Sequence, residues 1–125
     1  MFLSDLLDRG TELLASAGVE SPRVDAELLA AHVLGFSRGE LQSKLITAYE
    51  IEDASSIEAL FQKRSERIPL QHLTGVAYFR NLTLKVGPGV FIPRPETEGL
   101  AELAIQALRA VPGEAIAVDL CTGSG

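Results

Sequence analysis

The chain has 125 residues, 46% of them hydrophobic, which is enough apolar material for a folded core and excludes intrinsic disorder by composition. Its formal net charge is −6, and residues 1–68 carry 7 basic and 12 acidic side chains. An acidic first half argues against nucleic-acid binding, which relies on lysine and arginine neutralising phosphates.

Cysteine content and the first residues indicate where the protein works. Cys121 is the only cysteine, so an intrachain disulfide is excluded and a reducing compartment is favoured. The segment from Met1 to Arg9 contains acidic residues where a secretory signal would be basic, and no apolar run has the length of a membrane span. We therefore expect a cytoplasmic, monomeric protein without membrane or nucleic-acid partners.

Residues 1–73 show apolar residues at helical spacing and predict a small helical bundle. A first helix begins near Leu3 and stops at Gly18, and a second begins at Ser21-Pro22 and ends at Gly35. A capping box, Ser37 to Glu40, opens a short third helix. A fourth runs from about Asp53 to Pro69, with Lys63, Arg64 and Arg67 placed to favour its negative end.

The hydrophobic period changes to two after Gly75, which predicts a β-hairpin connector over residues 74–90. Leu82, Leu84 and Val86 share one face, and Arg80-Asn81 forms a two-residue turn between the strands. Another helix opens at Arg94-Pro95 and ends before Pro112-Gly113, with its apolar stripe at Leu100, Leu103, Ala104, Ala107 and Leu108.

The last residues, 115–125, read as a buried strand that runs into a glycine-rich loop. In an α/β protein such a loop precedes a helix, and a parallel strand needs a neighbour and a crossover. We therefore expect a mainly α chain that ends inside a truncated α/β domain spanning 91–125.

Asp119 distinguishes between cofactors for this loop. Glycines at 123 and 125 let the backbone approach a ligand. A carboxylate just before the loop would repel the pyrophosphate of a dinucleotide but favours the cationic sulfonium and ammonium groups of S-adenosylmethionine (SAM). The alternative is a buried strand whose glycines serve only turn geometry. With two histidines and one cysteine, we predict no metal site.

The segment Phe91-Ile92-Pro93-Arg94-Pro95-Glu96-Thr97-Glu98 is the second candidate. Two prolines restrict the backbone around Arg94 and so fix the position of its guanidinium. On physical grounds alone we favour a structural interpretation, in which Arg94 pairs with an acid and Thr97 caps the following helix.

Taken together, several motifs resemble the peptide chain release factor glutamine methyltransferase family, whose members are class I SAM-dependent methyltransferases. They occur in order and at familiar spacing: Thr74-Gly75, Tyr78-Phe79, the octapeptide 91–98, and Asp119-Leu120-Cys121-Thr122-Gly123-Ser124-Gly125. The resemblance implies a helical substrate-recognition domain (1–73), a hairpin connector (74–90) and the start of a Rossmann-like domain (91–125). The implied reaction moves a methyl group from SAM to the side-chain amide nitrogen (N5) of the glutamine in a release factor's Gly-Gly-Gln motif.

The resemblance also assigns residues to the cofactor site. Cys121, Thr122, Gly123, Ser124 and Gly125 match the SAM-binding loop, and Asp119 matches the acid that closes the preceding strand. Phe91, Pro93, Arg94, Glu96 and Thr97 match the segment at the pocket entrance. Cys121 stands where the family usually has glycine, so we expect its φ to stay negative. With no histidine nearby to activate it, we interpret Cys121 as a packing residue and not as a nucleophile.

No catalytic residue is predicted within this chain. The family's Asn-Pro-Pro-Tyr motif, which would orient the substrate amide, is expected beyond residue 125, because the only asparagine here, Asn81, is followed by Leu82. We therefore expect these 125 residues alone to be inactive. Two alternatives stay open: a helical binding module without catalysis, and a fragment of a nicotinamide-dependent oxidoreductase.

Overall fold

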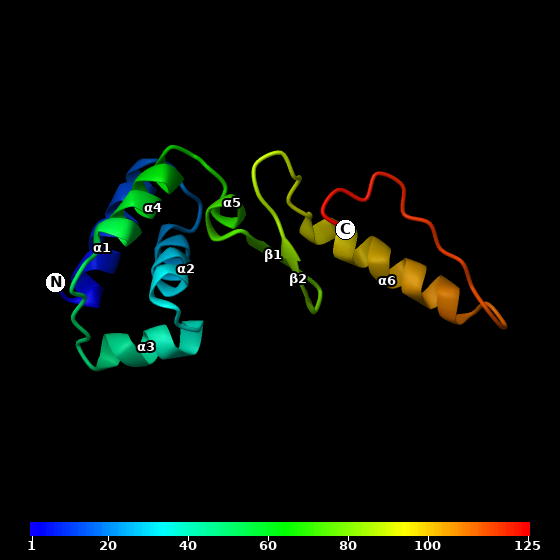
Figure 1. Ribbon diagram of the computed structural model, residues 1–125, viewed down its shortest axis with the longest axis horizontal. Helices are drawn as coiled ribbons and strands as arrows, with labels where there is room; N and C mark the ends of the chain where they lie inside the picture. Colours follow the sequence, from blue (N-terminus) through cyan, green and yellow to red (C-terminus); the bar gives the residue numbers. More distant parts are fainter. The chain divides into compact units, whose positions relative to one another are not determined.

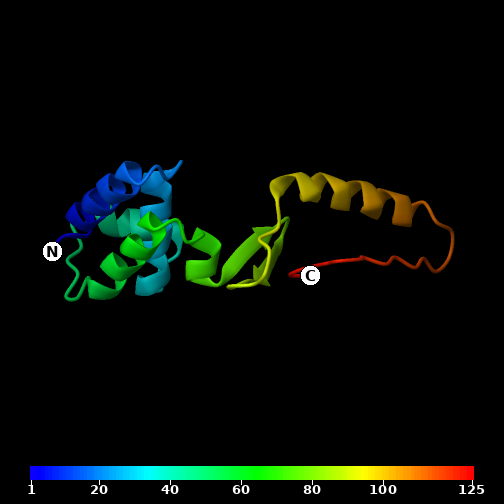
Figure 2. The same cartoon turned by 90° about the horizontal axis from the view of Figure 1, so that it is seen from above.

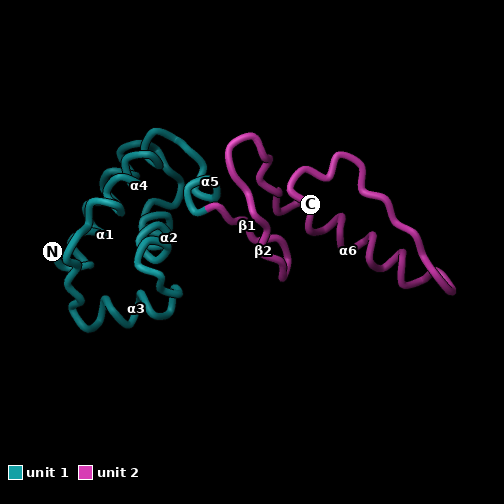
Figure 3. The backbone as a smooth tube through the Cα atoms, viewed as in Figure 1, with its two compact units in different colours: residues 1–74 teal, residues 75–125 magenta.

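The structure, a computed structural model, describes all 125 residues and is mainly helical, with six helices and one two-stranded hairpin (Figure 1). The chain divides into two compact units, Met1–Thr74 and Gly75–Gly125 (Figure 3). None of the helices combines the length and apolarity that a membrane crossing requires.

Five helices make up the first unit: α1 (Leu3–Ser16), α2 (Pro22–Leu34), α3 (Arg38–Ile46), α4 (Ser55–Ser65) and α5 (Leu70–Thr74). Helices α1, α2 and α4 contact one another, and α3 and α5 pack against α2. Their shared core is built from apolar side chains spaced three and four residues apart. The largest fully buried ones are Phe61, Leu3, Leu6, Leu7, Leu14, Leu29, Leu41 and Ile57.

The predicted helix starts and stops are largely confirmed. Gly18 and Gly35 both adopt positive φ just after α1 and α2, which is the conformation that ends a helix. The capping box is present: the Glu40 amide donates to Oγ of Ser37 (3.2 Å), and the Ser37 amide donates to Oε2 of Glu40 (2.7 Å). Ser21 occupies the cap position of α2, but its side chain makes no capping hydrogen bond, contrary to expectation.

The fourth predicted helix is too long. Helix α4 ends at Ser65 because Arg67 adopts a left-handed φ of 72°, which an α-helix excludes. Ile68 therefore lies outside the helix, and a short helix that we did not predict, α5, follows Pro69. At the other end Oδ1 of Asp53 accepts a hydrogen bond from the Ser55 amide (2.8 Å), so Asp53 precedes the helix.

The second unit begins with the predicted hairpin. Strands β1 (Val76–Phe79) and β2 (Leu82–Lys85) are antiparallel, with Phe79 opposite Leu82, so Arg80-Asn81 is the two-residue loop. Arg80 adopts a φ of 54°, as the first position of a tight hairpin turn requires. Helix α6 (Pro95–Arg109) ends before Pro112 as predicted, and none of its residues is buried.

The predicted strand over residues 115–120 does not form. This segment is drawn without regular structure in Figure 2. The side chains of Ile116, Val118 and Leu120 are all exposed. The reason is that the hairpin is the only sheet, and no strand offers these residues a hydrogen-bonding partner. Apolar alternation favours a strand only where a neighbouring strand can satisfy its backbone.

Candidate functional site

The predicted cofactor loop is an exposed series of turns. Gly123 and Gly125 both have positive φ, and the Gly125 amide donates to the carbonyl of Thr122 at 3.3 Å. No side chain lies within 4 Å of where a β-carbon would stand at either glycine. Asp119 is exposed and makes no ion pair. The Gly125 amide is therefore engaged within the loop, while the Gly123 amide and the Asp119 carboxylate have no internal partner.

Cys121 departs from expectation within this loop. Its φ is 59°, in the left-handed region, whereas we expected a negative value. A β-carbon in that region lies close to the following carbonyl oxygen, which costs about 1–2 kcal/mol, and glycine avoids this cost. The packing role that we assigned to Cys121 is also wrong, because the side chain is exposed.

The octapeptide 91–98 forms the entrance to α6. Arg94 occupies the N-cap position with extended backbone, Pro95 is the first helical residue, and the Thr97 amide donates to the Arg94 carbonyl (3.0 Å). Glu96 lies in the first turn, where its charge suits the positive end of the helix. Arg94 forms no ion pair and Thr97 makes no side-chain cap, so the structural interpretation of both residues is wrong in detail.

The two predicted cofactor segments are not brought together. No hydrogen bond or ion pair joins residues 91–98 to residues 119–125, and Phe91 is 90% exposed. These segments offer one carboxylate and backbone amide donors. Such groups fit a ligand that carries a positive charge and also has hydrogen-bond acceptors. Cofactor binding by these residues stays a prediction.

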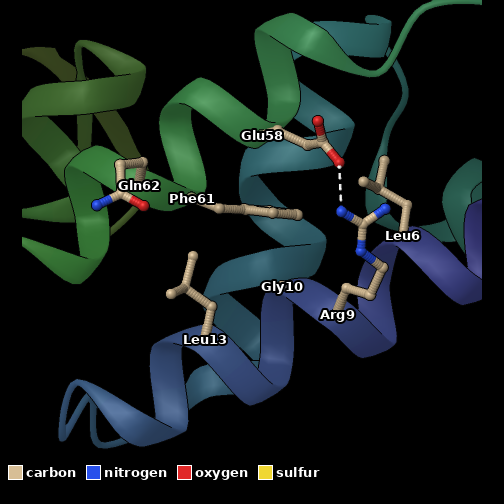
Figure 4. Close-up of a pocket in the computed structure, with 7 residues that line it drawn as sticks. All are labelled: Leu6, Arg9, Gly10, Leu13, Glu58, Phe61 and Gln62. Carbon is tan, nitrogen blue, oxygen red and sulfur yellow. Dashed lines mark ion pairs between the residues drawn. The ribbon is translucent and has the colours of Figure 1, made fainter.

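The helical unit contains a groove that sequence reasoning missed. It lies between α1 and α4, has a volume of about 330 Å³, and is shown in Figure 4. It is lined by Leu6, Arg9, Gly10, Leu13, Glu58, Phe61 and Gln62. The signal that could have revealed it is Gly10, which interrupts a leucine-rich helical pattern although glycine disfavours helix interiors.

An ion pair spans this groove. Nη2 of Arg9 on α1 lies 3.1 Å from Oε1 of Glu58 on α4, and the dashed line in Figure 4 marks it. Both side chains are substantially exposed, so the pair contributes at most about 1 kcal/mol to stability. Such a pair can open at little cost when another charged group approaches.

The predicted basic cluster late in α4 serves the interior of the unit. Arg64 donates to Oδ2 of Asp25 on α2 (2.8 Å), and both side chains are largely buried. Arg67 donates to the carbonyls of Ala17 and Gly18 (3.2 and 2.9 Å), so it satisfies the end of α1 and not of its own helix. Lys63 and Arg64 lie in the last turn of α4, as expected, whereas Arg67 lies beyond its end. Arg64 also donates to the carbonyl of Ile68, which follows the helix (3.2 Å).

Arg23 is at the centre of a further charged network. It donates to Glu27 on its own helix (2.9 Å) and to Asp8 on α1 (2.7 Å). Burial lowers the pKa of Arg23, but the hydrogen bonds to Glu27 and Asp8 outweigh this, so its pKa is raised. Glu27 is itself buried and also accepts from Gln42 on α3 (3.1 Å). The network therefore joins α1, α2 and α3.

Comparison with known proteins identifies the family. A family model described as the PrmC N-terminal domain matches residues 5–75, more than half of the chain. The chain belongs to the PrmC N-terminal domain family. The five helices of the first unit, α1 to α5, all lie within or overlap the matched residues, so the PrmC N-terminal domain corresponds to this helical unit.

Curated relatives extend the similarity beyond this PrmC domain. The chain is 52% identical over 123 residues to a release factor glutamine methyltransferase of Mycolicibacterium smegmatis, covering 98% of this chain and 42% of the relative. The chain is also similar to a protein of the same description from Streptomyces coelicolor, with 52% identity over 118 residues, covering 94% of this chain and 41% of the relative. A third such protein, from Mycobacterium tuberculosis strain H37Rv, is 45% identical over 125 residues, covering 100% of this chain and 40% of the relative. The chain thus spans about two fifths of these relatives' length.

Proposed function

We propose that this chain is the amino-terminal part of a protein methyltransferase that acts on peptide chain release factors. In this proposal a methyl group passes from SAM to the amide nitrogen of the glutamine in the Gly-Gly-Gln motif. The observation that carries the proposal is 52% identity to a release factor glutamine methyltransferase over 98% of this chain. The enzyme would act in the cytoplasm as a monomer.

The two units would contribute differently. The helical unit would bind the release factor, and the hairpin would connect it to a Rossmann-like domain that begins near Phe91. Support for a separate binding role comes from the core of the helical unit, which is complete within residues 1–74. The catalytic residues are expected beyond residue 125.

The residues of this chain would hold the cofactor and not perform the transfer. When bound, SAM supplies an electrophilic methyl group on a cationic sulfur. Asp119 would attract that positive charge, and the exposed amide of Gly123, which makes no internal hydrogen bond, would donate to the cofactor's acceptor groups. Phe91, Pro93, Arg94, Glu96 and Thr97 would line the entrance, with Arg94 positioned by its flanking prolines.

The test uses a chain extended to the full length of the relatives. SAM and NAD are titrated by calorimetry, and the protein is then incubated with SAM and a release factor. Mass spectrometry should detect the gain of one methyl group on the Gly-Gly-Gln glutamine. Binding of NAD without SAM would instead support the oxidoreductase alternative.

Asp119→Asn provides a matched change within the cofactor site. Because it removes a negative charge without changing shape, we expect SAM affinity to fall by about 10-fold, which corresponds to about 1.4 kcal/mol. Glu114→Gln is the control, since Glu114 is also exposed in the same irregular segment. Equal SAM affinity in the two variants would contradict the role of Asp119.

A binding module without catalysis is the second candidate. The groove between α1 and α4 favours it, because a folded helical unit with a surface depression can bind a protein without a cofactor. A release factor that binds the extended chain and is never methylated would support this candidate over the first.

A further inference from the structure

The accessible apolar part of the groove between α1 and α4 is the side chain of Leu13. The ring of Phe61 packs against Gly10 and occupies the place where a side chain there would stand, so Leu6, Gly10 and Phe61 lie buried beneath the groove (Figure 4). Leu13 is 37% exposed, although it belongs to the same helical stripe as the buried Leu6 and Leu14. An apolar side chain from outside would find apolar contacts there.

The border of the groove is acidic. Asp5 and Glu12 are exposed on α1, one turn before and one turn after the groove residue Arg9. Neither carboxylate forms an ion pair. On α4, Glu58 lines the groove, and Glu66 directly follows the end of the same helix. Arg9, already paired with Glu58, is the only cation among the lining residues.

The cations of the helical unit do not offset this acidity, because most of them are used internally. Arg23 and Arg64 are paired with Asp8, Glu27 and Asp25, and Arg67 faces backbone carbonyls. Lys44 lies over the rings of Phe36 and Tyr49, 5.6 and 4.8 Å from their centroids. Lys63, next to the groove residue Gln62, is exposed and unpaired, but Asp5, Glu12, Glu58 and Glu66 outnumber it and Arg9, so the charge around the groove is negative on balance.

We propose that this groove is the surface on which the helical unit docks a release factor, and that it takes a segment carrying an apolar side chain flanked by lysine or arginine. The apolar side chain packs against the exposed side chain of Leu13, and the flanking cations meet Glu58, Asp5 and Glu12. Charge complementarity selects a basic segment, and the small volume selects a single anchor. This inference rests on the proposed function, because the release factor is the partner that the proposed function names.

The first test measures binding of the 125-residue chain to a release factor from M. smegmatis, the source of a relative at 52% identity. Leu13→Asp places a charge in the apolar part of the groove, and we expect the dissociation constant to rise by at least about 10-fold. Val33→Asp is the control, because Val33 on α2 is also 37% exposed and lies outside the groove. Val33→Asp should change the affinity for the release factor by less than about 2-fold. Circular dichroism shows whether both variants fold.

The second test removes charge without changing shape. Asp5→Asn/Glu12→Gln should weaken binding about 5-fold at low salt, and the loss should shrink as salt rises from about 50 to about 300 mM. Glu20→Gln/Glu114→Gln changes the net charge equally at exposed positions outside the groove and should bind like the unmodified chain.

The outcomes separate this inference from the proposed function. If the unmodified chain binds and both groove variants bind equally well, the groove is not the docking surface and the proposed function is unaffected. If the chain does not bind while the full-length enzyme methylates the release factor, the inference alone fails. If the full-length enzyme neither binds nor methylates a release factor, the proposed function fails with it.

Discussion

Gly10 on α1 lies directly against the ring of Phe61 on α4. A β-carbon at position 10 would overlap Cε2 of that ring and would lie only 2.7 and 2.8 Å from its Cδ2 and Cζ atoms. Phe61 is 2% exposed and belongs to the core, so its ring has little room to withdraw. The contact between α1 and α4 therefore depends on the absence of a side chain at position 10.

Gly10→Ala should consequently destabilise the helical unit. Overpacking a core costs about 1–3 kcal/mol of unfolding free energy, and the better helix propensity of alanine offsets about 1 kcal/mol, so we expect a net loss of up to about 2 kcal/mol. Urea unfolding followed by circular dichroism measures it. Gly39→Ala is the control, because Gly39 lies in α3 with nothing within 4 Å of its β-carbon position. It should leave stability unchanged or raise it.

A double variant tests the cause. Adding Phe61→Leu to Gly10→Ala removes the ring that the β-carbon would strike. The double variant should then lose less unfolding free energy than the sum of the losses of the two single variants, since both changes act on one contact. Strict additivity would show that the cost of Gly10→Ala has another origin.

Arg67 combines an unfavourable backbone conformation with useful hydrogen bonds. Arg67→Ala loses the bonds to the Ala17 and Gly18 carbonyls and keeps the φ of 72°, so we expect a loss of about 1–2 kcal/mol. Arg67→Gly loses the same bonds but adopts this φ freely, and should be about 0.5–1 kcal/mol more stable than the alanine variant. Lys63→Ala, at an exposed position without a polar side-chain contact, is the control. The opposite order of the two Arg67 variants would contradict this account.

The pair Asp25–Arg64 should behave differently from the exposed pair Arg9–Glu58. The side chains of Asp25 and Arg64 are 12% and 17% exposed. Arg64→Met therefore leaves a largely buried carboxylate without its partner and should lower the free energy of unfolding by about 2–3 kcal/mol. Asp25→Leu/Arg64→Met removes both charges and should recover most of that loss. Arg9→Gln breaks the exposed pair and should cost less than about 1 kcal/mol. Equal losses for Arg64→Met and Arg9→Gln in urea unfolding would refute the distinction.

These contacts mark what local sequence patterns can predict. Caps, prolines and apolar spacing predicted α1, α2, α3, the hairpin and α6, because each signal acts within a few residues. The same reasoning placed Arg67 and Ile68 inside α4. Arg67 leaves the helix in a conformation that is supported by its hydrogen bonds to the Ala17 and Gly18 carbonyls just after α1, about fifty residues earlier, which no local pattern specifies.

The candidate sites show the same limit. The groove requires Gly10 and Phe61 to meet across two helices, and no pattern within either helix specifies that contact. The carboxylates of Asp25 and Glu27 were not predicted to be buried, because their arginine and glutamine partners come from other helices as well as their own. In the glycine loop, the cofactor residues proposed from motif matching stay a prediction, and the pattern over residues 115–120 could not provide the neighbouring strand that a strand there requires.

The capping box gives a prediction for pH. The hydrogen bond from the Ser37 amide lowers the pKa of Glu40 below its usual 4.5, and the Ser37 side chain adds to this effect. A carboxyl whose pKa is lower in the folded state stabilises the fold above its unfolded pKa, and this contribution disappears as pH falls through the folded value. Glu40→Gln should therefore reduce the melting temperature near about pH 7 and have little effect near about pH 2.5. Glu20→Gln, at an exposed position outside any helix, should have little effect at either pH. A Glu40→Gln effect of equal size at both pH values would show that the carboxylate charge does not contribute to the cap.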